Sequence, residues 1–248
     1  MIAYARTLAL LVVLTLVGCS KMSIRSATPH ETAHPEWTYA GEHGPQHWAE
    51  DFPECGMTGQ SPVDIRDAEP ADLPPLEFTY AGVDGRIRDT GHAVQVDSEG
   101  GTLLIGEAVH VLLQLHFHVP SEHTIEGEHF DAVIHLVHLD PDSQIAVVGV
   151  PISVGDENSY VEDVLDEMDK PVASREEVEL EDILPEDLTY YSYLGSLTTP
   201  PCSRGVQWYM LANPIEASRT QIDRLATHYR GNVRPVQALD GRTITRSR

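Results

Sequence analysis

Basic residues are scarce in this 248-residue chain. Lys and Arg together number 16 against 39 Asp and Glu, which gives a formal charge of −23 at pH 7. Such a surface repels phosphate backbones and anionic lipid headgroups, so the composition excludes nucleic acid and a charged membrane surface as electrostatic partners. Apolar residues still make up 41% of the chain, which is enough for the core of one large domain.

The apolar run at the N-terminus, residues 8–17, is too short to cross a bilayer. It follows Arg6, and we interpret residues 1–18 as a signal peptide. The segment Leu16-Val17-Gly18-Cys19 resembles a bacterial lipobox, which predicts a lipid on Cys19; the alternative is an ordinary signal peptide with an incidental cysteine. Residues 19–35 would then be a lipidated tether. The protein would be exported and periplasmic or at the cell surface, with this lipid as its one membrane anchor.

The chain has only three cysteines. If Cys19 carries the lipid, Cys55 and Cys202 remain, and the oxidising compartment of exported proteins predicts a disulfide between them. Metal ligation by this pair is the alternative.

Short apolar runs alternate with turn residues from residue 76 onward, which predicts a mainly β fold over residues 36–248. The expected strands are 76–80, 92–96, 102–105, 109–119, 132–139 and 145–153. Two surface helices are also expected. One covers 159–168 and stops before Pro171, and the other begins after Ser218 with a capping-box pattern and is closed by Gly231.

Two histidines on one predicted strand are candidate metal ligands. Side chains alternate along a strand, so His116 and His118 share a face with Gln114. The opposite face, predicted to enter the core, carries Val111, Leu113, Leu115, Phe117 and Val119. A hydrolytic or hydrating zinc site needs a third protein ligand and an open position. His135 and His138 on the next strand lie on opposite faces, and spacing alone does not choose between them.

Further motifs surround these histidines in a fixed order. They are Gly44-Pro45-Gln46-His47-Trp48, Gln60-Ser61-Pro62-Val63-Asp64-Ile65, Gly91-His92-Ala93, Ser121-Glu122-His123-Thr124, His135-Leu136-Val137-His138 and Ser196-Leu197-Thr198-Thr199-Pro200-Pro201. From about Trp37 to Ile244 the chain resembles an α-class carbonic anhydrase of the bacterial type. The resemblance implies one catalytic domain on a large, mostly antiparallel twisted sheet of about ten strands, with zinc at the floor of a conical cleft.

The same resemblance implies the metal ligands. It selects His135 as the third zinc ligand beside His116 and His118. It gives Gln114 as the hydrogen-bond partner of His116, and the backbone carbonyl of Asn232 as that of His118.

The implied reaction is reversible hydration of CO2 to bicarbonate and a proton by zinc hydroxide. Thr198 would orient the hydroxide and donate to Glu122, because an ionised carboxylate can only accept. His92 would act as the proton shuttle. Residues implied to receive the substrate are Val137, Val147, Leu197, Thr198, Thr199 and Trp208. Those implied to order the connecting waters are Tyr39, Thr90 and Gln95, of which Thr90 and Gln95 stand where the family usually has asparagine.

One departure from the family concerns the third ligand. Val133 stands where the family usually has a glutamate that accepts from this histidine, and valine has no acceptor. A zinc-loaded binding or adhesion protein with little turnover is therefore an alternative to the enzyme, although the three histidines, Glu122 and Thr198 favour catalysis. A simple zinc carrier would not explain Thr198 or the apolar wall. The expected oligomeric state is a monomer or dimer.

Overall fold

The structure is a computed structural model that describes residues 36–248 apart from 99, 173–176 and 181. The predicted signal peptide, the lipidated Cys19 and the tether to residue 35 lie outside the described residues. Within the described part of the chain, no helix is long and apolar enough to cross a membrane.

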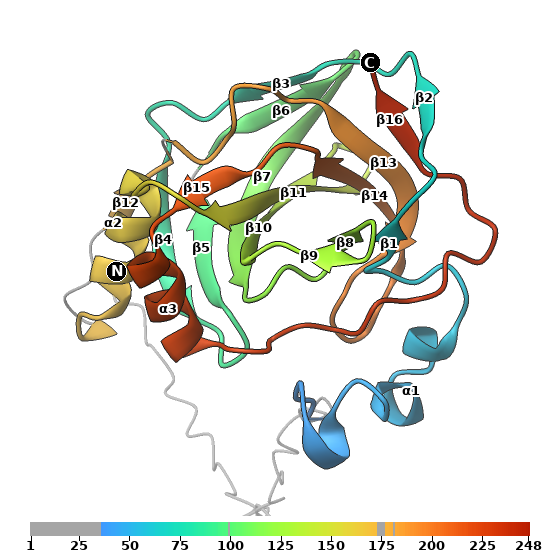
Figure 1. The fold of residues 1–248 in the computed structure, drawn as a ribbon, viewed down its shortest axis with the longest axis horizontal. Helices are drawn as coiled ribbons and strands as arrows, with labels where there is room; N and C mark the ends of the chain where they lie inside the picture. Colours follow the sequence, from blue (N-terminus) through green and yellow to red (C-terminus); the bar gives the residue numbers. More distant parts are fainter. Residues whose placement is uncertain (1–35, 99, 173–176, 181) are drawn as a thin grey trace, which may run out of the picture. The chain divides into compact units, whose positions relative to one another are not determined.

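A sheet of 13 strands forms the body of the fold (Figure 1). Its main path runs β12-β4-β5-β7-β10-β11-β14-β13-β16-β2, and β3, β6 and β15 pair alongside. The strands of this sheet are β2 (Glu69–Ala71), β3 (Leu76–Thr79), β4 (Asp84–Asp89), β5 (Val94–Ser98), β6 (Thr102–Ile105), β7 (Ala108–His118), β10 (Ala132–Leu139), β11 (Ile145–Val154), β12 (Glu177–Glu179), β13 (Tyr190–Ser196), β14 (Arg204–Leu211), β15 (Ile215–Ala217) and β16 (Thr245–Ser247). A smaller sheet contains β1 (Asp64–Ile65), β8 (Thr124–Ile125) and β9 (Glu128–His129).

The predicted mainly β architecture is confirmed, and the sheet differs from the prediction in two details. It has 13 strands rather than about ten, and it is mixed, because three of the described strand pairings are parallel while the others in this sheet are antiparallel. Strand β11 runs parallel to both β14 and β15, and β16 runs parallel to β2. Parallel neighbours need a long return connection. The chain between β11 and β14 provides one, since it includes a helix and two further strands.

Strand β7 departs from the simple alternation predicted for it. Its pairing with β10 skips Leu113, so the residues on either side of this bulge alternate in opposite phase. The predicted core residues after the bulge are buried as expected: Leu115, Phe117 and Val119. Val111 and Leu113, however, are 47% and 44% exposed, and the prediction that they enter the core was wrong. Leu112 is buried instead.

Both predicted helices are present and lie beside each other, and α2 contacts β4 and β12 (Figure 1). Helix α2 is Ser159–Met168, and α3 is Arg219–His228. The capping box of Ser218 and Gln221 forms as predicted, and α3 ends at His228 rather than at Gly231. The remaining helical segments are short: η1 (Gly41–His43), α1 (Trp48–Asp51) and η2 (Pro53–Gly56).

Strand β10 is buried on both faces, and each face contributes residues to a different hydrophobic cluster. Ile134 and Leu136 join the larger cluster, which includes the apolar residues of α2 and α3. Val133 belongs to a second cluster with Val147 and Trp208. The side chains that alternate with Ile134 and Leu136 therefore line the face of the sheet turned away from that larger core.

The disulfide predicted from the cysteine count is confirmed: Cys55 in η2 is bonded to Cys202. The two cysteines and Trp48 form a third cluster, against which Trp37 and Tyr39 pack. This bond ties the N-terminal aromatic segment to the loop that follows Thr198.

Candidate metal centre

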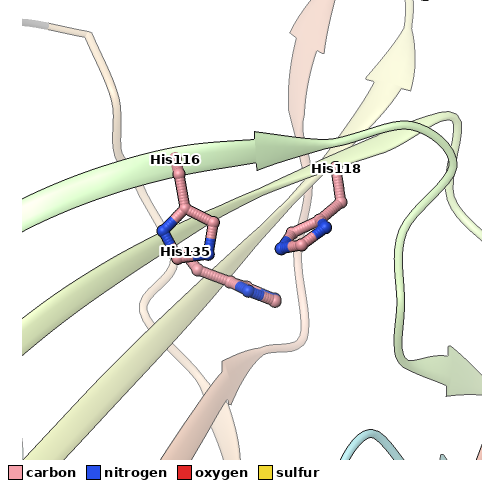
Figure 2. Close-up of side chains that lie close together, drawn as sticks. All are labelled: His116, His118 and His135. Carbon is pink, nitrogen blue, oxygen red and sulfur yellow. The ribbon is translucent and has the colours of Figure 1, made fainter. Parts of the chain in front are cut away.

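Three histidine rings from two adjacent strands point toward one another (Figure 2). His116 and His118 lie near the end of β7, and His135 lies on β10 directly opposite His116 in the register. One ring nitrogen from each histidine lies within 4.8 Å of the others. The alternation of β10 turns His138 to the other face of the sheet, where its Nε2 is hydrogen-bonded to the Tyr80 hydroxyl. The strand register thus makes the choice between His135 and His138 that spacing left open.

Hydrogen bonds fix which nitrogen of each β7 histidine can face a metal. The Nδ1 of His116 lies 2.9 Å from the side-chain oxygen of Gln114, and the Nδ1 of His118 lies 2.5 Å from the backbone oxygen of Asn232. These oxygens accept, so each Nδ1 carries the proton and each Nε2 keeps its lone pair. The Nε2 of His118 is buried and has no hydrogen-bond partner among the described residues. Both expected partners are therefore in place, and the donor set fits a divalent metal ion.

The imidazoles are also in the charge state that a metal requires. Burial lowers the pKa of His116 and His135 well below the ordinary histidine value, and the neighbouring His118 ring adds to the effect. Both rings are consequently neutral at neutral pH, which is the ligating form.

Among the described residues, His135 has no hydrogen-bond partner on the side of its ring away from the other two histidines. Its Nδ1 lies 3.8 Å from the Oε2 of Glu122, the same oxygen that lies 3.4 Å from the Nε2 of His118, so Nδ1 faces the candidate site. Its Nε2 is buried without a hydrogen-bond partner in the described part of the structure. Val133 is fully buried two residues earlier on the same face and supplies no acceptor. The absence of a side chain at Gly149 leaves room for the Met210 sulfur beside the His135 ring.

Glu122 is fully buried beside the three histidines. Its Oε1 accepts a hydrogen bond of 2.9 Å from the backbone N–H of Arg234. Burial raises the pKa of the Glu122 carboxyl, and His118, the Arg234 N–H and a hydrogen bond from the Thr198 hydroxyl oppose that rise. Arg234 was not predicted as part of the site, and its contribution through a backbone group leaves no signal in the side-chain pattern.

Apolar side chains from three neighbouring strands lie in one row next to the histidines. Val137 pairs with Val147, and Val147 pairs with Trp208, across β10, β11 and β14. Leu197 packs against the same cluster, and the Trp208 ring centroid lies 4.9 Å from that of His135. The structure thus brings four of the residues implied for substrate binding into one apolar surface.

His92 lies in the turn between β4 and β5. Its ring stacks on Trp37 with centroids 3.7 Å apart and an angle of 11° between the planes. Burial lowers the pKa of His92 below the value near 6.5 that an exposed ring would have. Trp37, His92 and Asn232 help line a cavity of about 470 Å³.

The polar residues implied to order water are already engaged in protein contacts. The Thr90 hydroxyl accepts from the backbone N–H groups of His92 and Ala93, at 3.2 and 3.0 Å. The Gln95 amide donates to the carboxylate of Asp97 at 2.5 Å. Tyr39 makes an edge contact with the His92 ring, at 6.5 Å between centroids. Their role in ordering water stays a prediction.

His123, also not predicted as part of the site, lies in a buried hydrogen-bond chain beside His135. The Oγ of Ser61 accepts from the Ser196 N–H and is 2.8 Å from the Tyr193 hydroxyl, which is 2.6 Å from the Nε2 of His123. Either hydroxyl can donate in the Ser61–Tyr193 contact, and the direction of the Tyr193–His123 bond depends on which ring nitrogen of His123 carries the proton. Burial lowers the pKa of His123 to about 3, so the ring is neutral. Its Nδ1 has no hydrogen-bond partner in the described ranges.

The fold and the site together are those of a metalloprotein: a large mixed sheet carries three histidines that could hold one metal ion. Residues 43–248 match the eukaryotic-type carbonic anhydrase family. A carbonic anhydrase of Pectobacterium atrosepticum is 36% identical over 88% of this chain and 93% of its own length. The chain belongs to the carbonic anhydrase family, and the expectation of an enzyme of this family is confirmed.

Solved structures agree with this assignment. The alpha-carbonic anhydrase of Thermovibrio ammonificans, in complex with the inhibitor sulfanilamide, has a TM-score of 0.78 and 38% identity, and the match covers 85% of this chain and 98% of that one. Dioscorin DB3S of Dioscorea polystachya is also similar, with 33% identity over 65% of each chain. The disulfide is typical of extracellular or periplasmic proteins.

Proposed function

We propose that this protein catalyses the reversible hydration of CO2 to bicarbonate and a proton, with Zn²⁺ held by His116, His118 and His135. The observation that carries the proposal is the group of three converging imidazoles, in which burial keeps His116 and His135 in the neutral, ligating form. The chemistry supplied by a bound zinc ion is a lower pKa for water, an effect for which this family is the type case.

Glu122 and Thr198 would orient the nucleophile. The Glu122 carboxylate only accepts hydrogen bonds, so the proton of the Thr198 hydroxyl points toward it. A lone pair of the Thr198 hydroxyl would then accept a hydrogen bond from the attacking oxygen. This bond would orient the attacking oxygen so that one of its lone pairs points at the carbon of CO2. The backbone N–H of Thr198 would hold one CO2 oxygen, and Thr199 would complete the same pocket.

The apolar row formed by Val137, Val147, Leu197 and Trp208 suits an uncharged substrate. CO2 gains by leaving water for such a surface, whereas bicarbonate, being charged, is poorly held there. The proton released by the reaction would leave through His92, whose ring borders the cavity next to Trp37.

A stopped-flow CO2 hydration assay on protein with measured zinc content tests the proposal. We expect hydration that a sulfonamide inhibits. Thr198→Ala should keep its zinc and lose roughly 100-fold in kcat/KM, the usual cost of one positioned hydrogen-bonding group. Stoichiometric zinc without sulfonamide-sensitive hydration would overturn the proposal.

That negative result would favour a second function, zinc-dependent binding with little turnover. One observation favours it. The Nε2 of His135 is buried without a partner among the described residues. The presence of Glu122 and Thr198 beside the histidines supports catalysis instead.

The site would operate outside the cytoplasm. Residues 1–18 would direct export, the lipid on Cys19 would anchor the chain in the periplasm or at the cell surface, and residues 19–35 would link it to the catalytic domain at 36–248. The partners would be CO2 and bicarbonate, and the protein would be a monomer or dimer.

A further inference from the structure

The turn that carries His92 is attached at its base to the end of helix α3. Asp89, the last residue of β4, accepts a hydrogen bond of 2.8 Å from the backbone N–H of Gly91. The same carboxylate oxygen accepts a hydrogen bond from the hydroxyl of Tyr229, the residue that caps α3. One carboxylate therefore joins the backbone of the turn to a side chain 140 residues further along the chain.

A second contact connects the turn to the candidate metal site. The side-chain amide of Asn232 donates to the backbone oxygen of His92 at 3.3 Å, while its backbone oxygen lies 2.5 Å from His118. Tyr229 and Asn232 are three residues apart and line the same cavity as His92. The segment after α3 thus contacts the turn from two directions.

Within the turn, Asp89 and Thr90 accept hydrogen bonds from its backbone N–H groups, and the external contacts add to these. Gly91 adopts a φ of +82°, in the left-handed region that favours glycine, and is exposed at the tip of the turn. The Tyr229 hydroxyl is well suited to the contact. Burial and the neighbouring Asp89 carboxylate raise the pKa of Tyr229 to about 12, so it remains a donor at neutral pH.

We infer that Tyr229 is a positioning residue for proton transfer, which acts through Asp89 to hold the His92 turn at the edge of the cavity that Tyr229 and His92 both line. The inference rests on the proposed function and adds a residue to it. A proton relay depends on the ring lying at a fixed distance from the connecting waters. Loss of the Tyr229–Asp89 bond would let the turn move and would reduce the fraction of time for which His92 is correctly placed.

The test separates proton transfer from CO2 attack in the zinc-loaded protein. In dilute buffer, Tyr229→Phe should lower kcat by about three- to tenfold, the change expected when one hydrogen bond of ordinary net strength is lost. The kcat/KM for CO2 should stay within twofold, and added imidazole buffer should restore kcat. Asp89→Asn should lower kcat in the same way and serves as the second variant if Tyr229→Phe folds poorly.

Tyr190→Phe is the matched control. It also removes a tyrosine hydroxyl bond, here 2.6 Å to the backbone oxygen of Pro74, but away from the cavity. Both kinetic constants should be unchanged in this control. A matching fall of kcat there would show that the effect is general destabilisation and would overturn the inference.

Measurements in a His92→Ala background distinguish failure of the inference about Tyr229 from failure of the proposed proton shuttle. If His92→Ala lowers kcat and Tyr229→Phe adds nothing to it, the inference holds. If His92→Ala lowers kcat but Tyr229→Phe alone does not, the inference fails and the proposed function stands. If His92→Ala leaves kcat unchanged, the proposed shuttle itself fails.

Discussion

Replacing Val133 by glutamate would give the buried Nε2 of His135 an acceptor, which none of the described residues supplies. A metal ion on Nδ1 requires the proton to sit on Nε2, where the described residues offer it no hydrogen-bond partner. A buried N–H without a partner costs about 1–3 kcal/mol. The Nδ1 of His123 is a second buried ring nitrogen without a partner among those residues, in a ring 6.1 Å from that of His135. A carboxylate from position 133 could therefore accept from the His135 ring.

The magnitude follows from this cost. If the full 1–3 kcal/mol is recovered in the metal-bound state, zinc should dissociate roughly 10- to 100-fold more slowly from Val133→Glu than from the natural protein, in line with partner substitutions at other metal-ligating histidines. The assay is transfer of zinc to a chromogenic chelator, followed over time. Circular dichroism and thermal unfolding would show that each variant is folded.

Two further variants keep the prediction testable if a buried glutamate disturbs the core. Val133→Gln supplies a neutral acceptor and should also slow zinc loss, by a smaller factor. Val133→Leu adds volume without an acceptor and should not slow it. Equal dissociation rates for the natural protein and the glutamate and glutamine variants would refute the reasoning about His135.

Three other results are expected. Cys55→Ser/Cys202→Ser should lower the free energy of unfolding by about 2–5 kcal/mol in urea titrations. Folded His138 has a pKa of about 4 because it is buried, so the unfolded chain binds more protons below pH 6.5 and stability falls by roughly 3 kcal/mol from pH 6.5 to 4. His138→Gln should flatten that part of the pH profile. Glu122→Gln should retain zinc and lose roughly 100-fold in kcat/KM for CO2.

The sequence allowed the elements with strong local signals to be predicted. The apolar runs over β6, β10 and β11, the stripe of α2 and the capping box of α3 all appear where they were expected. Strands β13 and β14 were not predicted, although β14 supplies Trp208. Their polar and glycine residues interrupt the alternation, and pairing with β11 stabilises β14 through contacts that are distant in sequence.

The residues of the candidate site could be predicted where the type of side chain indicates its role. His116 and His118 follow from the period of a strand, whereas His135 required the family resemblance, and its orientation became visible only in the register with β7. Bulges leave no local signature, so the exposure of Val111 and Leu113 was missed. Contacts made by backbone groups, such as the Arg234 N–H on Glu122, depend on how distant segments meet and could not be predicted from residue types.

Zinc-edge anomalous diffraction from crystals of the zinc-loaded protein tests the central claim most directly. The account predicts one zinc ion at about 2.0–2.1 Å from a ring nitrogen of His116, of His118 and of His135, with a fourth position open to solvent. An ion bound elsewhere, or a His135 ring turned away from the metal, would contradict it.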